Sequence, residues 1–136
     1  MKRNNVLTIM SLLSIVLLSL HLTDDIVYGT DKSPVLNVVA IAVLVIWLYG
    51  TLVLAERRSG HLIMLLGSIA GMVIFTVHAS RTGGLSAGTV AASSGAFFFV
   101  WTLLALAVTS VFSAILSAQG LWNLRRSKAP NEPISD

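Results

Sequence analysis

The chain has 136 residues, of which 55% are hydrophobic and only 11% are charged, and its mean hydropathy is +0.85. This composition is typical of a membrane protein and excludes an ordinary soluble domain, which carries more charge. The absence of cysteine excludes disulfides and thiolate metal sites. The formal net charge of +3 comes from short basic flanks of apolar runs, so it indicates membrane orientation rather than nucleic-acid binding.

The first apolar run extends from Val6 to Leu22 and follows the basic start Met1–Asn5. A basic start and an apolar run are also features of a signal peptide, but no small-x-small cleavage pattern follows here. We therefore interpret the run as a retained helix. Because the run is slightly short for a hydrocarbon core of about 30 Å, the first span is predicted to extend over residues 6–27.

Three more spans are predicted, at about residues 35–55, 61–80 and 97–121. Pro34 suits the first position of a helix. The second span is bulky and has few small residues, so we expect it to face lipid most. Residues 82–96 are rich in small and polar residues, and they are compatible with a loop, a re-entrant segment or a helix extension. Residues 1–124 would form one membrane domain, and 125–136 a basic and then disordered cytoplasmic tail.

The basic residues predict the orientation of these spans. With four spans, the N-terminus, the turn at 56–60 and the C-terminus lie on one side of the membrane. That side holds Lys2, Arg3, Arg57, Arg58, Arg125, Arg126 and Lys128, whereas the other side holds Lys32 and Arg81. Cytoplasmic segments carry the excess of Lys and Arg. The predicted fold is therefore an all-α integral membrane protein, a compact up-down bundle of four transmembrane helices in the cell (inner or plasma) membrane with both termini cytoplasmic.

A polar cluster is predicted at the extracytoplasmic ends of the first and third spans. Its members are His21, Asp24, Asp25, His78 and Arg81. Hydrocarbon tolerates such groups poorly, and carboxylates are unfavourable near a helix C-terminus. Pairing of an acid on the first span with Arg81 on the third resolves both problems. One hypothesis is therefore a structural clamp between two helices, and the alternative is a ligand site.

Several ligands are compatible with this cluster. His21, Asp25 and His78 form a two-histidine, one-carboxylate set of a kind that binds metal ions, and Asp24 would then orient one of the rings. A haem between His21 and His78, or a quinone or lipid head group hydrogen-bonded to the same side chains, also fits the residue types. Proton sensing by the histidines is a further alternative. The sequence leaves the cofactor undetermined.

Small residues at helical spacing predict where the spans pack. They include a GxxxG pair on the third span and serines or alanines on the first and fourth spans, namely Gly67, Gly71, Ser14, Ser110 and Ala114. Small side chains at such positions allow two helix backbones to approach closely. At the cytoplasmic end, His61, Trp47 and Tyr49 are expected at the membrane interface, where aromatic and amphipathic side chains are common.

The function predicted from these features is that of a small, non-enzymatic accessory, assembly or interaction subunit. Its predicted partners are the lipid bilayer and other membrane subunits or further copies of itself, and not nucleic acid. The alternatives are a membrane protein that binds a metal, a haem or a quinone through His21, His78 and Asp25, and a small oligomeric transporter. The chain has no phosphate-binding loop, nucleophile elbow or zinc-protease motif, so no sequence signal favours an enzyme.

Overall fold

The structure is a computed structural model that describes residues 3–28, 34–81 and 94–126. These residues form four α-helices: α1 (Arg3–Tyr28), α2 (Pro34–Leu52), α3 (Arg58–Arg81) and α5 (Ser94–Arg126). Each helix is long and apolar enough to cross a membrane. The expectation of an all-helical chain with four such helices is therefore confirmed. Residues 82–93, which hold most of the segment whose structure the sequence left open, lie outside the described residues.

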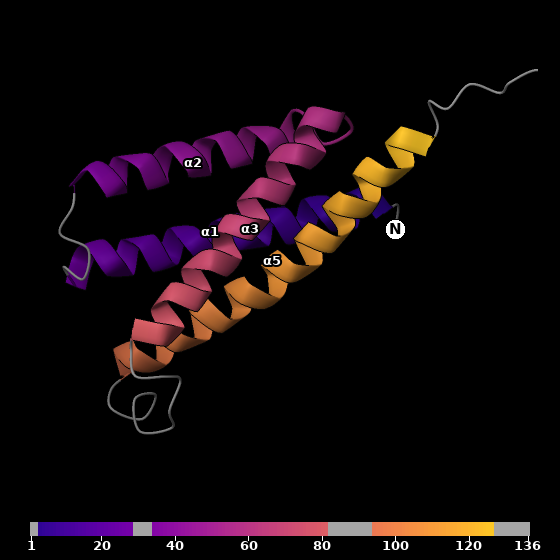
Figure 1. The fold of residues 1–136 in the computed structure, drawn as a ribbon. Helices are drawn as coiled ribbons and strands as arrows, with labels where there is room; N and C mark the ends of the chain where they lie inside the picture. Colours follow the sequence, from indigo (N-terminus) through magenta and orange to yellow (C-terminus); the bar gives the residue numbers. More distant parts are fainter. Residues whose placement is uncertain (1–2, 29–33, 82–93, 127–136) are drawn as a thin grey trace, which may run out of the picture.

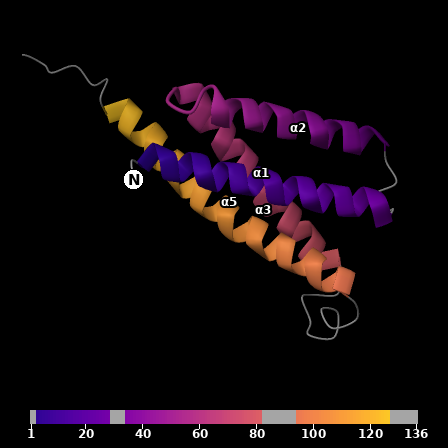
Figure 2. The ribbon, with the colours of Figure 1, turned by 180° about the vertical axis from the view of Figure 1, so that it is seen from behind.

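Successive helices run in alternating directions (Figure 1). The start of α1, the turn between α2 and α3 and the end of α5 lie at one end of the bundle, which we call the basic end after Arg57, Arg58, Arg125 and Arg126. The opposite end, which we call the histidine end after His21 and His78, contains the end of α1, the start of α2, the end of α3 and the start of α5. Seen from behind, the same grouping of helix ends is visible (Figure 2).

The turn between α2 and α3 is tight and closed by backbone hydrogen bonds. The Val53 amide donates to the Tyr49 carbonyl at 2.9 Å, and the Arg57 amide donates to the Leu54 carbonyl at 2.9 Å. Gly60 sits directly against the Leu54 carbonyl, and any side chain there would overlap this backbone group. Glycine is therefore required for α3 to start so close to the preceding turn.

Helices α3 and α5 pack as antiparallel neighbours through small residues. A Cβ added at Gly71 would lie 2.5 Å from Ser110 Oγ, and a Cβ added at Gly120 would lie 2.6 Å from Cε1 of His61. The same number of residues separates these two contacts on both helices, so α3 and α5 keep one antiparallel register. Such close approach of backbones is typical of helices that associate in membranes.

Helix α1 is joined to α2 by a closed set of hydrogen bonds around Trp47, which is only 1% exposed. The Trp47 indole N–H donates to Ser11 Oγ at 2.8 Å, and Thr51 Oγ1 donates to the Trp47 carbonyl at 2.9 Å. Because the Thr51 hydroxyl proton is used there, Ser11 must be the donor in its 2.8 Å bond to Thr51 Oγ1. Trp47 also covers Gly67 of α3, so this one ring links three helices near the basic end.

Helix α2 contacts the bundle mainly through its last two turns. Its buried residues are Trp47, Gly50 and Thr51, and the preceding residues are exposed or half-buried. The share of buried residues is lowest in α2 among the four spanning segments, as expected for a bulky span with few small residues. Towards the histidine end, α2 therefore leaves room between itself and helices α1 and α3.

Candidate functional site: the histidine pocket

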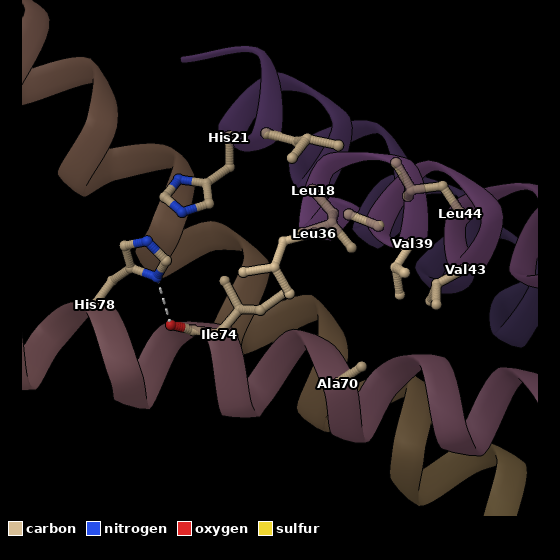
Figure 3. Close-up of a pocket in the computed structure, with 11 residues that line it drawn as sticks. Leu18, His21, Leu36, Val39, Val43, Leu44, Ala70, Ile74 and His78 are labelled. Atoms are coloured by element: carbon tan, nitrogen blue, oxygen red, sulfur yellow. Dashed lines mark hydrogen bonds between the residues drawn. The ribbon is translucent and has the colours of Figure 1, made fainter. Parts of the chain in front are cut away.

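Three aromatic rings from three helices meet at the histidine end. His21 of α1 is 1% exposed. Its ring lies 4.7 Å from the His78 ring of α3, measured between centroids, with an interplanar angle of 85°. Phe99 of α5 lies 4.7 Å from His21 and 6.0 Å from His78. The two histidines that the sequence placed on separate spans are thus in edge-to-face contact and point toward one another (Figure 3).

The backbone of α3 determines the tautomer of His78. Its Nδ1 lies 2.9 Å from the Ile74 carbonyl oxygen, one turn earlier on the same helix. A carbonyl oxygen only accepts hydrogen bonds, so Nδ1 must carry the proton. In the neutral ring, Nε2 therefore carries the lone pair. A nitrogen with a lone pair can accept a hydrogen bond or bind a metal ion. Fixing one ring nitrogen through a carbonyl in this way orients the other.

A cavity of about 300 Å³ extends from the two histidines along the space between α1, α2 and α3, and we call it the histidine pocket. His21 and His78 lie at one end of it (Figure 3). The other described residues that line it are aliphatic and include Leu18, Leu22, Val39, Val43, Ala70 and Ile74. The pocket therefore has an apolar body and two imidazoles as its polar groups, the usual composition of a site for a mostly apolar ligand.

The structure describes the side chains of only some of the acidic and basic members of the predicted cluster. Asp24 is half-buried on α1 and does not line the histidine pocket. Asp25 and Arg81 lie on α1 and α3 at the histidine end, but their side chains are outside the described residues, so the clamp stays a prediction. Among the described side chains, no group of three or more His, Cys, Asp or Glu is placed to hold a metal ion. The metal set of His21, Asp25 and His78 likewise stays a prediction.

A haem ligated by both histidines does not fit this arrangement. Two axial histidines bind the iron from opposite faces of a flat macrocycle, which must lie between them. Here the rings are in direct edge-to-face contact, with 4.7 Å between their centroids. No space for a macrocycle remains between them, so a haem at this position would require the α1–α3 contact to open.

Four of the five residues predicted to pack helices lie against a neighbouring helix. Gly67 lies under the Trp47 ring, and Gly71 lies against Ser110 Oγ. Ser14 Oγ is 3.0 Å from Thr109 Oγ1 of α5, and Ala114 is half-buried. Trp47 and His61, which the sequence predicts at the level of the membrane interface, are both buried between helices, and their depth in a membrane stays a prediction. Their partners Ser11 and Gly120 lie on distant helices, and no local pattern connects them to Trp47 or His61.

Comparison of the chain with protein-family models, with curated proteins and with solved structures finds no match. The geometry of the site therefore carries the functional argument alone.

Proposed function

We propose that this protein is an integral membrane protein whose four helices span the membrane, with the basic end in the cytoplasm. The distribution of side chains supports this. Large apolar side chains are exposed along all four helices, for example Ile9, Val38, Leu66 and Phe112, whereas serines, threonines and histidines outnumber large apolar residues among the buried ones. A soluble helix places its polar face outward, but lipid requires polar groups to face the interior of the bundle.

The proposed orientation can be tested with single cysteines, because the natural chain contains none. Ser59→Cys introduces one thiol at the basic end, and Thr30→Cys introduces one in the segment between α1 and α2. In intact spheroplasts, a membrane-impermeant maleimide should label the Thr30→Cys variant alone, and permeabilisation should expose Ser59→Cys. Labelling of Ser59→Cys before permeabilisation would reverse the orientation, and recovery of the protein in the soluble fraction would refute membrane insertion.

Within the membrane, we infer that the protein binds a lipid-soluble small molecule in the histidine pocket. The observation that carries this inference is the composition of the pocket wall, in which two imidazoles close one end of an otherwise aliphatic cavity. Leu36 and Val39 of α2 line the cavity and are more than half exposed, so the pocket opens beside α2 toward the surrounding lipid. A ligand can therefore enter from the bilayer without crossing water.

A quinone or quinol is the ligand class that best matches this wall. Its ring carries oxygens that exchange hydrogen bonds with imidazole, and its isoprenoid tail suits the aliphatic path along Leu18, Val39 and Val43. Nδ1 of His78 donates to the Ile74 carbonyl, so a quinol hydroxyl that reaches this ring would donate its hydrogen bond to Nε2. The volume of about 300 Å³ holds a ring and the start of a tail, and the rest of the tail would lie in lipid.

A binding role of this kind agrees with a non-enzymatic accessory or interaction subunit, which would hold or hand over a membrane-soluble molecule. The rival function is metal binding by His21, His78 and Asp25. Elemental analysis of protein purified without chelators separates the two. A stoichiometric metal that is lost in both His21→Ala and His78→Ala would support the rival function and contradict the quinone proposal.

Neighbouring positions on α2 provide a matched test of the pocket. Val39 lines the histidine pocket, whereas Val38 is 67% exposed and does not line it. Val39→Phe should fill the pocket and weaken binding of decylubiquinol to the purified protein by about tenfold or more, since overpacking costs ~1–3 kcal/mol. Val38→Phe should leave the affinity unchanged. Equal affinities of the two variants would contradict the proposal.

A further inference from the structure

A second cavity, of about 250 Å³, lies at the basic end between the start of α3 and the end of α5. It is lined by Arg58, Ser59 and Leu62 of α3 and by Leu121 and Arg125 of α5, and we call it the arginine cavity. The antiparallel register of α3 and α5 brings these distant parts of the chain together. The arginine cavity is at the opposite end of the bundle from the histidine pocket and shares no lining residue with it.

The side chain of Arg58 is held at this cavity by a contact with the other helix. Its Nη2 donates a 2.6 Å hydrogen bond to the Leu124 carbonyl, one of the carbonyls in the last turn of α5. The bond fixes the Arg58 guanidinium at the last turn of α5, and Arg125 of that turn lines the same cavity. Two positive charges from two helices therefore line one cavity, and no acidic residue is among the described residues that line it.

The apolar part of the cavity is suited to an acyl chain. Leu62 lies one turn further into α3 than Arg58, and Leu121 lies one turn further into α5 than Arg125. Leu62 is 49% exposed, so an apolar surface continues from the arginines toward the middle of the bundle. Nearby on α5, the Arg126 guanidinium lies 5.4 Å from the centroid of the exposed Trp122 ring. Such a Trp is typical of the head-group level of a membrane.

We propose that the arginine cavity is a binding site for an anionic phospholipid of the cytoplasmic leaflet. The phosphate would be bound by Arg58 and Arg125, with the Ser59 hydroxyl at the same rim, and an acyl chain would lie over Leu62 and Leu121. Guanidinium groups bind phosphate through paired, charge-assisted hydrogen bonds, and basic pockets between membrane helices on the cytoplasmic side bind anionic head groups. The site depends on the proposed membrane insertion with the basic end inside, but not on the ligand of the histidine pocket.

The matched pair of variants for this site is Arg58→Gln/Arg125→Gln against Arg57→Gln/Arg126→Gln. Both double variants lose two positive charges at the basic end, but only the first pair lines the cavity. Native mass spectrometry of the detergent-purified protein, with phosphatidylglycerol or phosphatidylcholine added, measures the retained lipid. The natural chain should retain phosphatidylglycerol preferentially. The cavity pair should lower that preference by about fivefold for each arginine removed, and the control pair should change it by less than about twofold.

Arg125→Gln alone keeps the Arg58–Leu124 bond, so it tests the site even if loss of Arg58 disturbs the fold. It should lower the preference for phosphatidylglycerol by about fivefold. Leu62→Ser should also weaken retention of phosphatidylglycerol, because it removes part of the apolar surface proposed for the acyl chain. Glycerol phosphate, which has no acyl chains, should not displace phosphatidylglycerol at equal concentration. Competition by glycerol phosphate would indicate a site for free phosphate and would overturn the proposal, as would equal losses in the cavity and control pairs. A protein that inserts in the membrane but lacks lipid preference would refute this site and leave the proposed insertion intact.

Discussion

His21 and His78 lie edge to face, with their ring centroids 4.7 Å apart, although they are on helices α1 and α3. Phe99 of α5 lies against both rings, so the three helices are joined at the depth where the histidine pocket begins. The same two side chains therefore serve both as a packing contact between helices and as the polar end of a cavity.

The two roles of His21 can be separated by substitution. His21→Ala removes a buried ring and should lower the free energy of unfolding by about 2–4 kcal/mol, by analogy with other large-to-small changes. His21→Phe keeps a ring against His78 and Phe99 and should cost less than about 1.5 kcal/mol. Unfolding by SDS in mixed micelles measures both values. His21→Phe should nevertheless lose decylubiquinol binding, and retention of full affinity by this variant would remove His21 from the proposed site.

Glycine is required where α3 passes under Trp47. A methyl group at Gly67 would overlap the rigid indole ring, which is held in place by its bond to Ser11. Gly67→Ala should therefore destabilise the protein by about 1–3 kcal/mol, the usual cost of overpacking. At Gly71 the neighbouring atom is the hydroxyl of Ser110, at 2.5 Å, and its Cβ is at 3.4 Å. Gly71→Ala should cost less than Gly67→Ala, and Ser110→Ala should relieve the cost at Gly71. Additive effects of the Gly71 and Ser110 changes would contradict the packing described.

Substitution of buried serines by alanine should change the stability of the protein by different amounts, according to the hydrogen bonds that each serine makes. Ser11 receives the Trp47 N–H and donates to Thr51, so Ser11→Ala leaves a buried donor without its acceptor and should cost about 1–3 kcal/mol. Ser113 is equally buried, but its hydroxyl has no hydrogen-bond partner among the described residues. Ser113→Ala should therefore be neutral or slightly stabilising in the same SDS titration. A larger loss for Ser113→Ala than for Ser11→Ala would show that this assignment of hydrogen bonds is wrong.

The clamp predicted from the sequence requires its own double-mutant cycle. Asp25→Ala should leave the charge of Arg81 without its counterion and lower stability, and the double variant Asp25→Ala/Arg81→Ala should recover part of that loss. Asp24→Ala is the matched control on the neighbouring residue. Strictly additive single effects, or a coupling as large for Asp24 as for Asp25, would exclude an Asp25–Arg81 pair.

The sequence predicted the fold well because apolar length is a strong signal. Four uninterrupted apolar runs separated by Gly, Pro and charged residues determine four helices, and the structure begins α2 at Pro34, as the run predicted. The positions of Gly67 and Gly71 also predicted close packing, because few other residues allow two backbones to approach. The composition did not predict which helix packs against each row of small residues.

The candidate site was less predictable, because it depends on relations between distant helices. Spacing along α1 and α3 placed His21 and His78 at one depth, but whether the rings face each other or a ligand depends on the rotation of both helices. The pocket exists because α2 is buried only near the basic end, and no local pattern in residues 35–46 predicts the space left between these residues and helices α1 and α3. The burial of His61 could not be predicted for the same reason, because the space for its ring comes from Gly120 on α5.

The three histidines of the chain allow the most direct test of the proposed function. His21 and His78 line the histidine pocket, whereas His61 is buried at the basic end and does not. Protein labelled with ¹⁵N-histidine, purified in detergent and titrated with decylubiquinol, should show ring-nitrogen resonance shifts for His21 and His78 that saturate together. The His61 resonances should not move. Absence of any shift, or equal shifts at all three histidines, would contradict binding of a quinol in the histidine pocket.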